Sequence, residues 1–550
     1  MNNVVSEQLP QIAKDSRKTQ ILLVAITVAT LLPFLNKAFH IDDPLFLWMA
    51  QQITKHPFDP YGLTVNWSTS PEPMWKVMQN PPLCSYYIAA VGSLIGWSEL
   101  AMHLAFLIWP LISILATFAI ARRFCHEPFV TALLTLFTPV FLVSATNVMC
   151  DVMLLALWLC SIECWIAGLE RKSWLLLTLS MSLAAAATLT KYFGISLVPL
   201  LAAYTLMHDR RFARYLALLV IPIVALVALE LTTRAHYGVG LLSGAVFLSR
   251  KMATFRPPWF AQFLTGLAFT GGCLITMTFF QPLRRWRFWF VASICTIVFL
   301  LLFHFFVPFH PAWAVGQNSK LVRMEGGVFA TVGAGILALT TADLVRHRDS
   351  SSLLLFLWIL GTFSFATFFN WSITGRTILP MAPAVIILLM RWYEKHRSQQ
   401  DRVLLRCACL VLAGAVSVTI AWADYRQANT ARDACGEFQK RFQAESSTIW
   451  FESHWGFQYY MQQWGATALN AADSKITSGD LIIFPANNTS IIPLPMDKLG
   501  PVETVQFPTL PLVSTHGHGT GAAFYSSARG TLPWAIDRIP PETYYVATFR

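Results

Sequence analysis

Long apolar runs recur along the first three quarters of the chain, and short polar segments separate them. A helix needs roughly 17 to 25 apolar residues to cross a bilayer, and the runs have about this length. The pattern therefore predicts about thirteen membrane spans. We place them at residues 20–38, 99–121, 128–147, 150–168, 173–190, 192–208, 215–233, 260–280, 287–308, 325–343, 352–370, 376–391 and 403–423.

The composition supports a polytopic α-helical membrane protein. The 550 residues are 55% hydrophobic and only 13% charged, and the mean hydropathy is +0.52. Soluble domains carry roughly 25% charged residues. A soluble core needs far less apolar material than this chain contains, so the excess is expected to face lipid.

The basic residues indicate how the chain crosses the membrane. The formal net charge is +11, but Lys and Arg fall in short clusters between alternate pairs of spans, such as Arg122 and Arg123 or Arg171 and Lys172. Such clusters mark the cytoplasmic side and form no stripe of the kind that binds nucleic acid. We predict a cytoplasmic N-terminus and an odd number of spans. The external parts are then residues 39–98, 234–259, 309–324, 371–375 and the C-terminal region.

The first external segment, residues 39–98, is long and rich in Trp and Pro. Its apolar positions from Leu45 to Ile53 predict a short amphipathic helix at the membrane surface. Pro81 and Pro82 end any preceding helix and can start the next one. The apolar stretch 83–97 is short for a span, and as a span it would move every later basic cluster to the opposite side. We therefore interpret it as an external or re-entrant helix.

The composition changes after residue 423. Residues 424–550 contain polar stretches, turn signals and strand-like runs at 447–451 and 480–484. This pattern predicts a small extracytoplasmic α/β domain after a transmembrane domain at residues 1–423. Most of the ten cysteines lie in apolar runs, where Cys acts as a small hydrophobe. Cys84 and Cys435 could pair only if the fold brings them together.

Two adjacent carboxylates, Asp42 and Asp43, follow the first span directly. Ionisable groups at a membrane face are costly and usually functional, and a carboxylate at this place could serve as a general base. The alternative is a structural role, because an Asp before Pro44 is also typical of a helix start. The two interpretations are compatible, since one carboxylate can cap the helix while the other reacts.

Three further charged residues lie at predicted external borders of spans. Asp151 starts a span and could equally cap its helix. Lys191 lies between two apolar runs on the side where Lys is less expected, so it either snorkels or contacts a phosphate at headgroup depth. Arg376 starts another span, and external Arg residues also suit anionic headgroups in general.

The chain carries four short motifs in order on the predicted external side: Asp42-Asp43-Pro44, Asn80-Pro81-Pro82-Leu83, Asp151-Val152-Met153-Leu154 and Leu189-Thr190-Lys191. In this order they resemble motifs of bacterial polyprenyl-phosphate-sugar glycosyltransferases of the GT-C class. This class is related to protein O-mannosyltransferases and to the lipid A aminoarabinose transferase. The resemblance spans roughly residues 20 to 423 and implies a GT-C-like membrane fold in the bacterial inner membrane.

The resemblance also implies a reaction. An acceptor hydroxyl, deprotonated by a carboxylate, attacks the sugar of a polyprenyl-phosphate donor with inversion at the periplasmic face. The implied roles are catalysis by Asp42 and Asp43, acceptor binding by Asp151 and Asn80, and donor-phosphate binding by Lys191 and Arg376. The implied partners are membrane lipids, the lipid-linked sugar and an acceptor. The acceptor is a protein, lipid A or an envelope glycan.

Several alternatives stay open in the sequence. The need for a divalent metal, the sugar and the acceptor are not determined by these residues. No Walker or Rossmann fingerprint is present, which disfavours a nucleotide-sugar donor. The competing class is a multispan transporter or lipid flippase. Such proteins often show inverted repeats and charges near the bilayer midplane, whereas the candidate charges here lie at the external borders.

Overall fold

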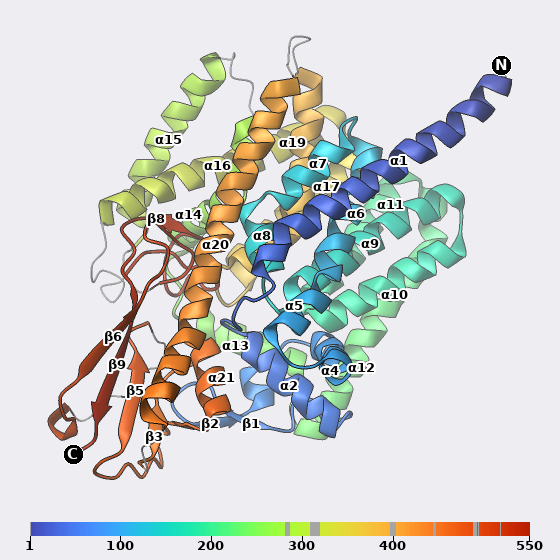
Figure 1. Cartoon of the computed structure of the whole chain (residues 1–550). Helices are drawn as coiled ribbons and strands as arrows, with labels where there is room; N and C mark the ends of the chain where they lie inside the picture. The colour runs from blue at the N-terminus through green and yellow to red at the C-terminus, as the bar shows by residue number, and fades with distance from the viewer. Residues whose placement is uncertain are drawn as a thin grey trace.

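The computed structural model describes residues 2–280, 286–308, 319–396, 403–443, 447–487, 492, 494, 496–517 and 519–550. A bundle of apolar helices forms the larger part of the molecule, and a strand-rich C-terminal region lies against one end of it (Figure 1). The amino end of α1 lies at the opposite end of the bundle from α2 and α21 (Figure 1). Residues 309–318 of the predicted external loop 309–324 lie outside the described residues.

The first half of the bundle is built from helices joined by short connections. These are α1 (Asn2–Leu31), α2 (Asp43–Lys55), α3 (Met74–Val77), α4 (Leu83–Ile95), α5 (Glu99–Phe106), α6 (Ile108–Phe124), α7 (Pro128–Leu136), α8 (Pro139–Ala145), α9 (Cys150–Arg171), α10 (Trp174–Thr190), α11 (Leu197–His208), α12 (Val220–Tyr237) and α13 (Leu241–Ala253). The remaining helices are α14 (Trp259–Cys273), α15 (Trp286–Phe306), α16 (Ser319–His347), α17 (Ser350–Ser364), α18 (Gly375–Ile378), α19 (Ala382–His396), α20 (Val403–Phe442) and α21 (Trp455–Trp464).

Eight helical stretches of the described residues are long and apolar enough to cross a membrane. A ninth results if α7 and α8, which bend by 63° at a break before Pro139, form one span. Three further predicted spans carry shorter apolar helices, and the predicted span 260–280 begins with α14. The chain is therefore a multi-pass α-helical membrane protein, as predicted, and thirteen spans stays a prediction.

The predicted surface helix in the first external segment is α2. Its apolar face, which includes Leu45, Met49 and Ile53, is buried against neighbouring protein. One neighbour is α4, which occupies the short apolar stretch 83–97 and begins directly after Pro82. Gly96 ends α4 with φ +97°, a conformation that glycine adopts without steric cost. Whether α4 enters the membrane stays a prediction.

The C-terminal region contains a five-stranded sheet with the order β4-β3-β5-β9-β6. Its strands β3 (Ile449–Phe451), β4 (Thr467–Ala468) and β5 (Leu481–Pro485) are parallel, whereas β9 (Glu542–Thr548) runs antiparallel to β5 and to β6 (Glu503–Phe507). The end of α20 and α21 cover this sheet through a shared apolar cluster that includes Phe438, Phe457 and Tyr544. The small α/β part that the sequence predicts is confirmed.

Helix α20 connects the bundle to this sheet without a break (Figure 1). It is 40 residues long, and the predicted boundary between residues 423 and 424 lies in its middle. The division into two domains stays a prediction. Cys84 and Cys435 are both buried and free.

One part of the C-terminal region packs into the helical bundle. We call it the return segment: residues 513–536, from β7 (Val513–Ser514) to its antiparallel partner β8 (Ala535–Ile536). Phe524 and Leu532 are buried in the main apolar core of the bundle. The indole nitrogen of Trp534 donates to the carbonyl of Gly272 in α14 at 2.8 Å. The C-terminal region thus reaches into the place where the candidate charges lie.

Candidate active site

The two adjacent carboxylates at the start of α2 face different surroundings. Asp43 is fully buried, and its oxygens accept backbone N–H bonds from His40 at 2.8 Å and Val148 at 2.9 Å. These bonds fasten the loop before α2 to the start of α9. The side chain of Asp42 is 29% exposed and makes no capping bond. Only Asp42 of this pair is therefore open to a reacting molecule.

The backbone explains how neighbouring residues diverge. Ile41 has φ +48°, a conformation that is rare and costly for a β-branched residue. Residues held in such conformations cluster at functional sites, where the surrounding structure enforces them. Here the two bonds to Asp43 hold the loop, so the strain at Ile41 turns Asp42 toward the charged residues across the site.

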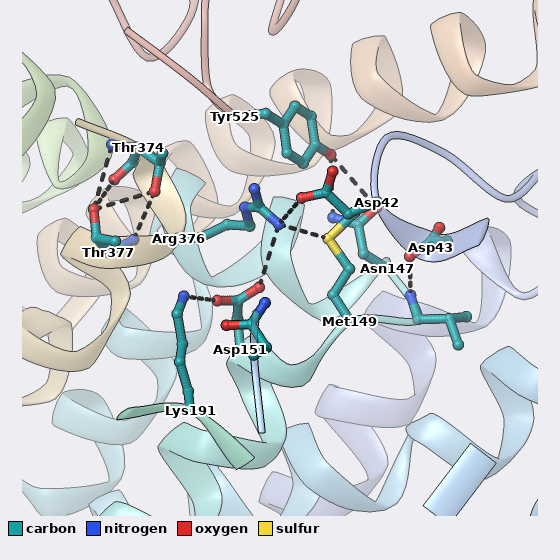
Figure 2. A network of polar contacts seen from close by, with 12 residues as sticks. Asp42, Asp43, Asn147, Met149, Asp151, Lys191, Thr374, Arg376, Thr377 and Tyr525 are labelled. Carbon is teal, nitrogen blue, oxygen red and sulfur yellow. Dashed lines mark hydrogen bonds and ion pairs between the residues drawn. The ribbon is translucent and has the colours of Figure 1, made fainter. Parts of the chain in front are cut away.

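Asp42 belongs to a network with the other charged residues that the sequence singles out (Figure 2). The Nη1 atom of Arg376 lies 2.8 Å from Asp42 Oδ2 and 3.9 Å from Asp151 Oδ2. The Nζ atom of Lys191 lies 2.6 Å from Asp151 Oδ1. The network therefore contains two carboxylates and two cations whose formal charges cancel, which lowers the cost of placing them at a membrane border.

The ends of three helices bring these side chains together. Asp151 lies in the first turn of α9, where the helix dipole favours a negative charge. Lys191 follows the last residue of α10 in an extended conformation. Arg376 lies in α18, which is started by a reciprocal capping box between Thr374 and Thr377 (Figure 2). All three termini open toward the same end of the bundle, so their charges meet.

A second polar network lies behind the first and is fully buried. The Nζ atom of Lys37 lies 2.5 Å from Asp424 Oδ2 and donates to Asn147 at 2.6 Å. Asp424 also accepts hydrogen bonds from Tyr525 at 2.8 Å and Thr515 at 2.7 Å. This network joins the segment after α1, the loop before α9, helix α20 and the return segment.

No pattern in the sequence predicts this second network. Lys37 follows an apolar run on the predicted external side, where the positive-inside rule disfavours a cation. That signal could have marked it as a buried functional or structural lysine. Its partner Asp424 is almost four hundred residues away, and no local pattern links the two.

Asn80, the predicted acceptor-binding residue, lies just before α4. Its carbonyl accepts a hydrogen bond from the Tyr61 hydroxyl at 2.5 Å, and its amide lies 3.7 Å from the Met78 sulfur. Both contacts stay within the external segment 39–98. The roles predicted for Asn80 and for the charged residues stay predictions.

Burial changes the acidity of groups near Asp42. It raises the pKa of Asp43 to about 7, although the two backbone N–H donors and the charge of Lys37 oppose this shift. Burial lowers the pKa of His40 to about 4, so that imidazole is neutral at neutral pH. Among the described residues, no group of three or more His, Cys, Asp or Glu side chains is placed to hold a metal ion.

The chain resembles several solved membrane glycosyltransferases in overall structure. ArnT from Cupriavidus metallidurans bound to undecaprenyl phosphate is 15% identical, with a TM-score of 0.38 over 85% of this chain and 93% of that one. The oligosaccharyltransferase AglB from Archaeoglobus fulgidus is 12% identical, with a TM-score of 0.44 over 82% of this chain and 64% of that one. The arabinofuranosyltransferase AftD from Mycobacteria is 12% identical, with a TM-score of 0.40 over 97% of this chain and 40% of that one.

No curated protein matches the chain in sequence. Residues 79–232, however, match the family model described as dolichyl-phosphate-mannose-protein mannosyltransferase. The matched region contains Asp151 and Lys191, which form the ion pair at the centre of the site. This match agrees with the motif order in the sequence and disfavours the transporter alternative. Over residues 79–232 the chain is therefore similar to a family of glycosyltransferases that use a lipid-linked sugar.

Proposed function

We propose that this protein transfers a sugar from a polyprenyl-phosphate donor to an acceptor hydroxyl, with inversion, at the periplasmic face of the bacterial inner membrane. The observation that carries the proposal is the charged network of Figure 2. It joins a partly exposed carboxylate to two cations at one end of the bundle. A base and a phosphate-binding pair are the groups that this reaction needs.

Asp42 is the proposed general base. Its carboxylate takes the proton of the acceptor hydroxyl while that oxygen attacks the anomeric carbon. The bond from the anomeric carbon to the phosphate oxygen breaks, and its electron pair leaves with the polyprenyl phosphate. The single displacement inverts the configuration. Asp43 supports the reaction by holding the loop, since both of its oxygens are occupied by backbone N–H groups.

Lys191 and Arg376 are the proposed partners of the donor phosphate. A phosphate oxygen that loses its bond to the sugar gains negative charge, and positioned cations stabilise that charge. In this structure Asp151 and Asp42 neutralise the two cations. A donor phosphate that draws Arg376 away from Asp42 would free the carboxylate to accept a proton. Donor binding and activation of the base are thereby coupled.

The acceptor-binding role of Asn80 and Asp151 belongs to the same proposal. The chemistry of the site fits any acceptor with a reactive hydroxyl, so a protein, lipid A and an envelope glycan all remain candidates. The same chemistry serves donors with different sugars. Comparison of envelope glycoconjugates with and without the protein by mass spectrometry identifies both.

The proposal is tested with Asp42→Asn in nanodiscs at fixed salt. The amide keeps the shape of the carboxylate but cannot take the proton, and loss of a general base costs typically 10²–10⁴-fold in rate. Glu72→Gln is the matched control, because Glu72 lies in β2 (Pro71–Pro73) of the same external segment. Turnover by Asp42→Asn within a few-fold of the wild type would exclude Asp42 as the base.

A further inference from the structure

The return segment is hydrogen-bonded to the backbone of the residues that directly precede Arg376. The N–H of Gly375 donates to the carbonyl of Phe524 at 2.7 Å. The N–H of Ser527 donates to the carbonyl of Ile373 at 2.8 Å, and the Ile373 N–H donates back to the Ser527 hydroxyl at 2.9 Å. The backbone before α18 is therefore fixed to the C-terminal region on both sides of Tyr525.

Tyr525 itself contacts both polar networks, and Figure 2 shows it near Arg376. It is almost completely buried. Its hydroxyl donates to Asp424 at 2.8 Å and accepts from the Asn147 amide at 3.1 Å. Its ring lies with its centroid 5.5 Å from the guanidinium carbon of Arg376. The tyrosine is held at its hydroxyl end and presents its ring to the cation.

The guanidinium of Arg376 has few other contacts that fix its orientation. Its ion pairs with Asp42 and Asp151 and its bond to the Met149 sulfur all use the same atom, Nη1. Its Nε is buried and has no hydrogen-bond partner within the described part of the chain. A guanidinium attached through one nitrogen can rotate about that contact. The ring of Tyr525 lies beside the guanidinium, where it can limit this rotation.

We propose that Tyr525 is a positioning residue that fixes the orientation of the Arg376 guanidinium in the site, so that the C-terminal return segment completes the active site. The inference rests on the proposed function, in which Arg376 binds the donor phosphate and releases Asp42. It gives the C-terminal region a direct part in the reaction. A cation–π contact at a partly desolvated site accounts for a roughly three- to thirtyfold effect.

The test compares Tyr525→Phe and Tyr525→Leu in nanodiscs. Tyr525→Phe keeps the ring, and Asp424 keeps its bonds to Lys37 and Thr515, so transfer and binding of undecaprenyl phosphate should stay within about threefold of the wild type. Tyr525→Leu removes the ring and should lower both by about tenfold. Tyr545→Leu is the matched control, because Tyr545 packs on Phe484 in the distant sheet. It should leave transfer unchanged.

A double-mutant cycle separates positioning from general damage to the fold. If Tyr525 acts through Arg376, Tyr525→Leu should have little further effect in an Arg376→Gln background. The same tenfold loss in both backgrounds would overturn the inference. So would tenfold weaker binding of undecaprenyl phosphate to Tyr525→Phe, since the ring is intact there. The Phe variant can overturn the inference even where Tyr525→Leu fails to accumulate.

The outcomes also separate this inference from the proposed function. Normal turnover by Asp42→Asn, together with coupling between Tyr525 and Arg376, would remove the assigned base and leave the positioning role in place. An inactive Asp42→Asn variant without such coupling would overturn the inference alone.

Discussion

The buried ion pair between Lys37 and Asp424 offers a sharp test of how the molecule is held together. Both side chains are fully buried, and the pair joins the end of the first span to α20. Removing one partner of such a pair typically costs 3–5 kcal/mol of the free energy of unfolding, because a charge stays buried without compensation. We expect Lys37→Met to cost about 3 kcal/mol, since Asp424 keeps its bonds from Tyr525 and Thr515.

Asp424→Leu should cost more than Lys37→Met. It leaves the ammonium of Lys37 with neutral oxygen partners, from Asn147 and Thr146. We expect about 5 kcal/mol for this variant. The double variant Lys37→Met/Asp424→Leu contains no buried charge at this place. It should lose about 2–6 kcal/mol, for the two donors of Tyr525 and Thr515 that no longer have an acceptor, which is less than the sum of the single variants.

Unfolding of the detergent-solubilised protein by a denaturing detergent, followed by Trp fluorescence, measures these differences. The matched control is Arg441→Met, which breaks an ion pair with Glu503 whose side chains are roughly half exposed. Exposed pairs contribute at most about 1 kcal/mol. Single variants that cost no more than this control, or a double variant as unstable as the sum of the singles, would refute the reasoning.

The remaining predictions concern the donor and the topology. Lys191→Arg should retain more donor use than Lys191→Ala, and Lys191→Glu should be worst, because a phosphate partner needs positive charge. Turnover against donor concentration measures this order, and equal values for all three variants would mean that Lys191 only snorkels. Cysteine labelling from outside should reach Ala528→Cys but not Arg171→Cys, in a background where the exposed Cys407 is replaced by Ser. The opposite result would reverse the predicted orientation.

The hydrophobic pattern was sufficient to predict the class of the fold. Lipid-facing helices must be apolar over their whole length, so their positions are visible in the sequence. The predicted spans all coincide with helical segments of the structure, although several helices are shorter than a full span. The bend between α7 and α8 lies at a break before Pro139, and a span count from apolar length does not register it.

Part of the site was also predictable. Asp42, Asp151, Lys191 and Arg376 stand out because charge at a membrane border is costly, and the structure brings all four together. The sequence could not show which of Asp42 and Asp43 is open to solvent. That difference depends on the positive φ of Ile41 and on a bond from Asp43 to Val148, more than one hundred residues along the chain.

The contribution of the C-terminal region was not predictable for a related reason. Tyr525 follows Phe524 in a short stretch of mixed composition, with no periodicity that marks it. Its position depends on backbone pairing between residues 373–375 and 524–527, which are about one hundred and fifty residues apart. The charges at the ends of the spans could be found one by one, whereas the groups that orient them could not.

The proposed transfer of a sugar with Asp42 as the base is tested most directly by mass spectrometry of envelope glycoconjugates. The cells compared contain the wild-type protein, Asp42→Asn, Glu72→Gln or no protein. The account predicts that one sugar is lost from the same acceptor in the Asp42→Asn and protein-free cells, and kept in the Glu72→Gln cells. Identical glycoconjugates in all four kinds of cell would contradict the proposal that the chain transfers a sugar to the envelope. A sugar that is lost from the protein-free cells but kept in the Asp42→Asn cells would contradict the role of Asp42.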